Sequence, residues 1–200
     1  ISGSTSDDVA NVTAGSGSFA YLNGTIDGLS QLNINSGTGV FGGPAVGTNG
    51  DGVYGGEGIV DINVNGGALY LDDDTQLRAN DTYDQDSDAE VQFLLSRDTD
   101  DNTFAGEIDA NIANIDGTIT GVIDLEAFAL GAGTTNFYTY DNVIEANTLN
   151  GTFDNVGVLD DLIFFDITAE YDGDDKVDLV LERLSFAEVL AEASQSSNQQ

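Results

Sequence analysis

The chain has 200 residues, of which 40% are apolar, enough for a hydrophobic core in one domain or two small ones. Its 36 acidic and 4 basic side chains give a formal net charge of -32, so it lacks the cations needed to neutralise nucleic-acid phosphates or anionic lipid head groups. Because cysteine and histidine are absent, disulfides, thiolate metal sites and Ser-His-Asp or Cys-His catalysis are excluded. The 25 glycines and single proline indicate short strands joined by tight turns, which is an all-β composition.

The first part of the chain contains short runs in which apolar and polar residues alternate. Residues 32–37 and 60–67 are two such runs, each ended by glycine, and alternation with period two predicts strands with one buried face. Leu-Asn-Ile-Asn at 32–35 is nearly copied by Ile-Asn-Val-Asn at 62–65. A second motif, with Gly-Thr at its centre, recurs at residues 22–26, 115–119 and 149–153. Such repeats favour a parallel β-helix, in which each rung covers its neighbour, although an antiparallel sandwich would show the same alternation.

Acidic residues cluster between residues 72 and 102, where we expect one strand at residues 91–95 between polar loops. Carboxylate and amide oxygens at alternate positions can converge on calcium. Asp109 stands at the twelfth place of a loop that begins at Asp98, but Thr103 occupies the sixth place, where an EF-hand loop requires glycine. Solvated acidic loops are the alternative interpretation. The calcium candidates are Asp84, Asp86, Asp88, Asp98, Asp100 and Asn102.

Residues 162–184 have the pattern of a β-hairpin. Apolar side chains alternate at residues 163–167 and again at 177–181, and the intervening residues 171–175 contain an Asp-Gly turn. We expect this hairpin to cap the open end of the repeated strands.

A helix is predicted at residues 185–193. Ser185 can cap it, Glu188 stands at the capping-box position, and Phe186, Val189 and Leu190 fall at helical spacing. Because helices this short are weak without packing, we expect it to be marginal or displaced when the chain is studied alone.

Three features of the second half occur in a recognisable order. The strand 138–144 is followed by 149–156, which contains the step Gly-Thr-Phe-Asp; the hairpin segments 167–172 and 177–183 come next, and then the helix with Asn198–Gln199 beyond it. In this order and spacing, residues 104 to 200 resemble the C-terminal passenger region of monomeric (type V) bacterial autotransporters, the part called the autochaperone. The unusual acidity and the Asp-rich stretch 72–102 depart from that family.

The resemblance implies a right-handed parallel β-helix capped by a C-terminal hairpin, with a short helix leading toward a β-barrel beyond the chain. Residues 1–103 would be upstream rungs with acidic loops, 104–184 the autochaperone-like end with its hairpin, and 185–200 the linker helix and start of the translocator. The residues implied as a folding nucleus in the cap and last rungs are Phe137, Tyr138, Tyr140, Phe153, Phe164, Phe165, Tyr171, Leu179 and Leu181.

The function implied is non-catalytic: the segment would nucleate folding of a passenger at the cell surface after export through the outer membrane. Its partners would be its own upstream passenger and its own β-barrel, with a cell-surface or host ligand as a further partner. We expect a monomer that binds no nucleic acid and no cofactor other than the calcium considered above.

Two other non-catalytic functions stay open. One is an adhesin or binding segment whose side contacts a host or neighbouring cell. The other is a calcium-stabilised secreted module, although the glycine-aspartate nonapeptide repeats expected of such a module are absent. Enzymes are not favoured for this segment, because a polysaccharide lyase needs a cationic or imidazole base and no carboxylate pair stands out in an apolar setting for a glycosidase. An upstream passenger could still carry an enzyme.

Overall fold

The computed structural model describes residues 8–22, 29–42, 53–54, 59–129, 136–159, 162–173 and 175–185, together with 187 and 189. Most of these residues lie in strands, so the predicted all-β class is confirmed. The strands β1 to β8 are Val9–Thr13, Phe19–Leu22, Leu29–Ser36, Thr38–Phe41, Val53–Tyr54, Ile59–Val64, Gly67–Leu71 and Gln76–Gln85. The strands β9 to β16 are Ala89–Arg97, Thr103–Phe104, Glu107–Ile115, Thr118–Ile123, Phe137–Gly151, Asn155–Val158, Phe165–Asp172 and Lys176–Arg183.

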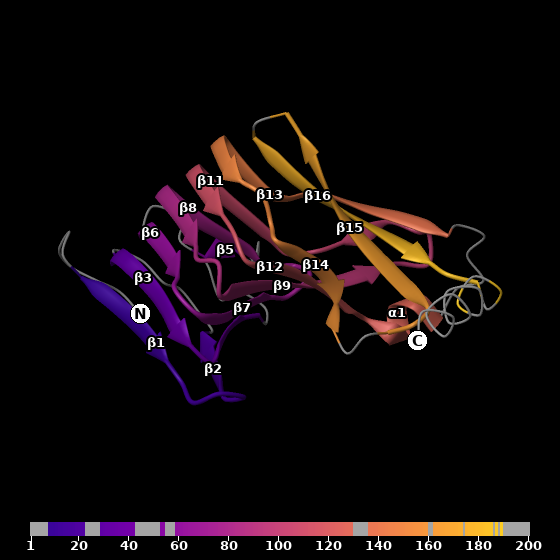
Figure 1. Cartoon of the computed structure of the whole chain (residues 1–200), viewed down its shortest axis with the longest axis horizontal. Coiled ribbons are helices and arrows are strands. Elements are labelled where there is room, and N and C mark those ends of the chain that lie inside the picture. The colour runs from indigo at the N-terminus through magenta and orange to yellow at the C-terminus, as the bar shows by residue number, and fades with distance from the viewer. Residues whose placement is uncertain are drawn as a thin grey trace, which may run out of the picture.

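The strands form two sheets, and the chain passes repeatedly from one sheet to the other (Figure 1). One sheet has the order β1-β3-β6-β8-β11-β13-β16-β15, and the other has the order β14-β12-β9-β7-β4-β2. All neighbours from β1 to β13 in the first sheet, and all along the second, are parallel. Successive strands are added from the N-terminal to the C-terminal end along the long axis of the molecule (Figure 1).

The near copies found in the sequence lie side by side. Leu32, Asn33 and Ile34 pair in register with Ile62, Asn63 and Val64, so each apolar residue stacks on its counterpart in the next strand. The four aliphatic side chains of this pairing are at most 1% exposed. The repeat in the sequence is therefore a repeat of register in the sheet.

The polar positions of these strands form a second row, which we call the amide ladder: Asn11, Asn33, Asn63, Asp84, Asn114 and Asn150. These residues are register partners across six parallel strands. The amide Nδ2 of Asn33 donates to Asn11 Oδ1 at 2.9 Å, and Asn63 donates to Asn33 at the same distance. Asn114 donates to Asp84, and Asn150 donates to Asn114. The ladder satisfies side-chain polar groups on the outward face of the sheet.

Glycines occupy bends between the two sheets where a side chain has no room. Gly67 has φ 81°, and an added Cβ would lie 2.3 Å from the carbonyl oxygen of Gly37. Gly151 has φ 90°, and its Cβ would lie 2.2 Å from the oxygen of Ile115. The glycines that end the alternating runs thus allow adjacent bends to stack closely.

The predicted hairpin is confirmed: β15 and β16 pair antiparallel, and Gly173 in the turn has φ 69°. β16 in turn pairs antiparallel with β13, so the hairpin ends the series of parallel strands (Figure 1). Lys176 follows the turn and begins β16, with its Nζ 4.0 Å from Glu145 Oε1.

Two other expectations need correction. The acidic stretch 72–102 is not one strand between polar loops, because residues 76–85 form the strand β8 in the first sheet, in addition to β9 in the second sheet, which contains the predicted strand 91–95. Its acidic side chains point outward, while Leu77, Ala79 and Tyr83 are buried. Because so many residues of this strand are polar, the alternation of buried and exposed positions was not recognised in the sequence. A second helix, α1 (Leu125–Ala129), was also not predicted.

The predicted helix at residues 185–193 lies mostly outside the described residues, and so do Phe186 and Leu190. The amide of Val189 donates to the carbonyl of Ser185 at 3.1 Å, which is one helical bond at the predicted start. One buried apolar cluster includes residues from Val12 to Leu181. The division of the chain into segments 1–103 and 104–184 stays a prediction. No helix in the described part of the chain is long and apolar enough to cross a membrane.

Candidate functional site

The place where the hairpin meets the parallel strands, which we call the C-terminal junction, brings together residues from β9, β12, β13, α1 and β15. Ile167 of β15 is 4% exposed and packs over Gly121 of β12, where an added Cβ would lie 2.7 Å from Ile167 Cδ1. The same Cβ would lie 2.8 Å from Leu95 Cδ1. Glycine at position 121 therefore lets the hairpin approach the second sheet closely.

A buried guanidinium lies at the centre of the junction. The Arg97 side chain is 1% exposed and forms an ion pair with Asp101 in the turn after β9. Its Cζ lies 5.3 Å from the ring centroid of Phe128 and 5.4 Å from that of Tyr138. Cations over aromatic faces are attracted by the ring quadrupole, and more strongly when water is excluded. Arg97 thus joins β9, α1 and β13 through one side chain.

Phe128 extends this cluster to the hairpin. Its ring meets Tyr138 edge-on at 5.1 Å and Phe165 of β15 edge-on at 5.7 Å. Edge-to-face pairs at these distances are a favoured aromatic arrangement. Asp124 positions α1, since its Oδ1 accepts hydrogen bonds from the amides of Glu126 and Ala127, which is an N-cap.

Tyr140 and Tyr171 tie the junction together in different ways. Tyr140 is 2% exposed, and its hydroxyl has no hydrogen-bond partner among the described residues. Burial raises the pKa of Tyr140, with a smaller contribution from Tyr138, while Arg97 opposes the rise. The Tyr171 hydroxyl of the hairpin accepts a 2.9 Å hydrogen bond from the amide of Phe153, beyond β13. The hairpin tip is therefore fastened to the last bend between the sheets.

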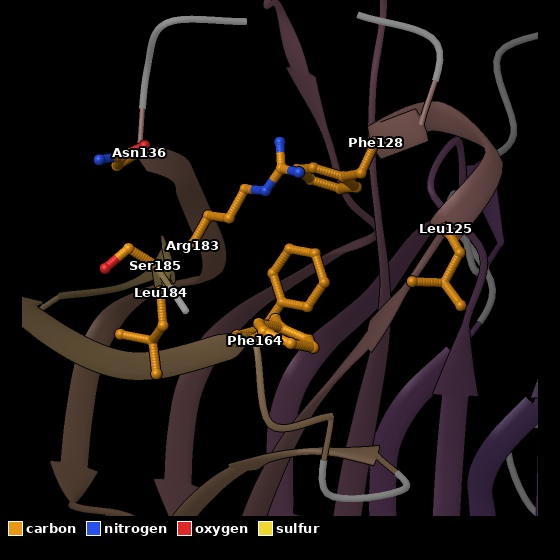
Figure 2. Close-up of a pocket in the computed structure, with 8 residues that line it drawn as sticks. Leu125, Phe128, Asn136, Phe164, Arg183, Leu184 and Ser185 are labelled. Carbon is orange, nitrogen blue, oxygen red and sulfur yellow. The ribbon is translucent and has the colours of Figure 1, made fainter. Parts of the chain in front are cut away.

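A pocket of about 560 Å³ opens at this end of the molecule (Figure 2). Its apolar lining comes from α1 and from the segments that flank the hairpin: Leu125, Phe128, Phe164, Phe165 and Leu184. Figure 2 shows the Arg183 side chain extending toward Phe128, and Phe164 lies below both side chains in this view.

The nine residues predicted as a folding nucleus separate into two groups. Tyr138, Tyr140, Phe153, Leu179 and Leu181 are at most 8% exposed and belong to the core, and Phe165 packs against it. Phe137, Phe164 and Tyr171 are 57%, 42% and 37% exposed. Phe137 and Phe164 thus do not contribute buried core, because Phe137 begins β13 on the outward side and Phe164 precedes β15.

The calcium candidates occupy two separate parts of the structure. Asp84 is the penultimate residue of β8 and belongs to the amide ladder, and Asp86 and Asp88 follow in the turn to β9. In the second turn, Asp98 Oδ1 accepts the amides of Asp100 and Asn102, and its Oδ2 accepts Asn102 Nδ2 at 2.7 Å.

These hydrogen bonds, that of the Asn102 side chain first, hold the pKa of Asp98 below its usual range. Asp109 lies apart on β11, paired with Arg78 at 2.7 Å. Among the described residues, no three acidic side chains are grouped as a metal would require, and calcium binding stays a hypothesis.

Sequence reasoning missed Arg97 and Phe128. Two signals were available: a lone arginine at the end of an apolar strand, and an aspartate at position 124 in the N-cap position before Leu-Glu-Ala-Phe. Comparison of the chain with protein-family models, with curated proteins and with solved structures gives no significant match.

Proposed function

We propose that this chain is a non-catalytic segment of an autotransporter passenger, exported through the outer membrane to the cell surface, and that its C-terminal part nucleates folding of the passenger. The observation that carries the proposal is the antiparallel hairpin that ends a series of parallel strands. The order of strand, Gly-Thr-Phe-Asp step, hairpin and helix in the sequence supports it. Its partners on this proposal are its own upstream passenger and its own β-barrel.

The fold that goes with this function is a parallel β-helix. Apart from the short strands β5 and β10, the strands from β1 to β14 alternate between the two sheets. Each of them up to β12 pairs with a counterpart further along the chain, and the separation ranges from 19 residues, between Phe19 and Thr38, to 37 residues, between Thr118 and Asn155. Repeated apolar positions then form continuous internal rows. The stacked bends at Gly37 and Gly67 are consistent with one rung lying directly on the next.

The physical basis of nucleation is that the end of a repeat protein must be covered. Each rung exposes apolar surface on the two sides that face its neighbours. At the C-terminal end there is no further parallel rung, and the hairpin covers this surface with Ile167, Leu179 and Leu181. The junction is thereby stable without further rungs, and each later rung gains about 25 cal/mol per Å² of apolar surface buried on the one already folded. Folding outside the cell then opposes backward movement through the membrane without another energy source.

Hydrogen exchange of the whole 200-residue chain tests this proposal. If the C-terminal part is the nucleus, amides in β13, β15 and β16 exchange slowest and those in β1 to β4 exchange fastest. Exchange that is uniform along the chain, or slowest in β3 to β7, would contradict nucleation and leave the adhesin segment as the better hypothesis. Calcium would be tested separately by thermal melts in chelator and in calcium, with magnesium at equal ionic strength as the control.

A further inference from the structure

The pocket at the C-terminal junction combines an apolar lining with the arginine Arg183, which forms no ion pair with the part of the chain that the structure describes. Three of the four basic side chains lie within 4.0 Å of a carboxylate: Arg78 of Asp109, Arg97 of Asp101 and Lys176 of Glu145. Within the described residues, Arg183 is in no such pair, although 36 acidic residues are present in the chain.

The lining of this pocket is aromatic on more than one side. Phe128 lines the pocket but is only 5% exposed, because its ring also contacts Arg97 and Tyr138. Phe164 and Leu125 are 42% and 55% exposed, so apolar surface is available to a ligand. Large exposed apolar side chains gathered around one hollow are a feature of binding sites.

We propose that this pocket binds a small aromatic carboxylate, with the ring among Phe128, Phe164 and Leu125 and the carboxylate on the Arg183 guanidinium. A guanidinium presents paired N–H donors that match a carboxylate, and an aromatic ligand can pack edge-to-face on phenylalanine. A volume of about 560 Å³ is within the range of small-molecule sites. The proposal does not rest on the passenger function, since it concerns only the pocket.

The charge of the whole chain makes the role of Arg183 testable. A net charge of -32 repels every anion at long range, so a neutral ligand of the same shape would bind better if Arg183 took no part. A preference for the anion therefore requires a specific cation in the pocket.

The experiment is a titration of the isotope-labelled 200-residue chain with 2-naphthoate, followed by amide chemical shifts, with 2-naphthamide as the matched neutral probe. We expect saturable shifts around residues 125, 128, 164 and 183, and a clearly tighter Kd for the acid than for the amide. Arg183→Gln should weaken naphthoate binding about tenfold and abolish the preference. Arg78→Gln, which changes the net charge equally at a distant site, should change the Kd less than about twofold.

The proposal is overturned if naphthamide binds as tightly as naphthoate, if Arg78→Gln has the same effect as Arg183→Gln, or if no saturable shift appears at these residues. Both arginines are partly exposed, so both variants should fold, and their unchanged amide spectra away from the site verify this. Failure here leaves the hydrogen-exchange test of the passenger proposal unaffected.

Discussion

The N-terminal strands and the C-terminal junction bury different kinds of side chain. In β3 and β6 the core residues are aliphatic and repeat in register, as Leu32 and Ile34 do with Ile62 and Val64. At the junction buried aromatic rings, those of Phe128, Tyr138, Tyr140 and Phe153, join the aliphatic side chains, and they do not repeat along the strands. The difference follows from the place of each strand in the sheet. A strand in the middle is covered by a neighbouring strand with a similar sequence, whereas the last parallel strand is covered by the hairpin, whose sequence differs.

Polar side chains differ in the same way. The parallel part of the first sheet repeats the amide ladder from strand to strand, from β1 to β13. The junction instead has single interactions with no counterpart elsewhere: Arg97 between two rings and the Tyr171 hydroxyl accepting the Phe153 amide. Side-chain contacts that repeat can be continued by adding further strands, whereas the contacts of Arg97 and Tyr171 occur once, where the series of parallel strands ends.

The largest effect should come from removing a buried aromatic ring. We expect Tyr140→Ala and Phe153→Ala each to lower the free energy of unfolding by about 3–5 kcal/mol, because each leaves a cavity at the junction. Phe41→Ala is the upstream control, with an equally buried ring at 0% exposure. If stability is polarised, Phe41→Ala loosens only the nearby strands and shifts the main denaturant transition less. Equal shifts for all three variants would remove the distinction between the two regions.

A smaller loss should follow from Arg97→Lys. Lysine keeps the charge beside Asp101 but loses the flat group that lies over Phe128 and Tyr138, so we expect a cost of about 1–2 kcal/mol. Arg78→Lys is the control on the upstream sheet, where the pair with Asp109 is 41% and 32% exposed and should change stability by less than about 0.5 kcal/mol. Denaturant unfolding at one salt concentration measures the stability of both variants. If Arg97→Lys leaves the free energy of unfolding unchanged, the contact of the guanidinium with Phe128 and Tyr138 does not stabilise the fold.

The pH dependence of stability should reveal an unfavourable carboxylate at Glu107, the first residue of β11. Burial, then Asp109 and Glu145, raise the pKa of Glu107 above its ordinary value of 4.5. The folded state therefore holds this proton more tightly than the unfolded state, and its contribution to stability is lost as the pH rises from 4.5 through the raised pKa.

Glu107→Gln should remove this loss and raise stability at neutral pH by about 1 kcal/mol or less, since the group is partly solvated. Thermal unfolding at pH 4 and pH 7 measures the gain in stability of the variant over the original chain, which should be larger at pH 7. A larger gain at pH 4 would contradict a raised pKa for Glu107.

The smallest effect concerns the amide ladder. Asp84 faces Asn63 in register but, as a carboxylate, has no hydrogen to donate to it, so the ladder is interrupted at this step. Asp84→Asn should complete the ladder and raise the free energy of unfolding by about 0.5 kcal/mol. Asp81→Asn, on the exposed part of the same strand, changes the charge equally and should have no such effect.

Much of the fold could be predicted from the sequence, for physical reasons that vary along the chain. Alternation and near copies reveal strands and their repetition, because register in a parallel sheet brings like residues together, as at Asn33 and Asn63. The hairpin was predicted because its Asp-Gly turn is a local signal. Strand β8 was missed because its outward residues are acidic and resemble a loop.

The site was less predictable than the fold. Tyr138, Tyr140 and Phe153, which the sequence placed in a folding nucleus, are buried. Arg97 and Phe128, which it did not single out, meet only through the packing of β9 against α1. That contact joins residues 31 positions apart with no motif between them. The exposure of Phe164 and Phe137 likewise depends on where the strands begin, which residue type alone does not determine.

The reversal of direction at β16 has a consequence for contacts between molecules. In the described part of the chain, β15 is the outermost strand at the C-terminal end, while β1 at the other end is flanked by a parallel neighbour. Parallel and antiparallel edges present different hydrogen-bonding patterns, so the edge at β15 does not match the edge at β1. β15 also carries exposed acidic side chains at Asp166, Glu170 and Asp172. We therefore expect the hairpin to prevent one molecule from joining the next end to end, which is how stacked strands otherwise grow into fibres.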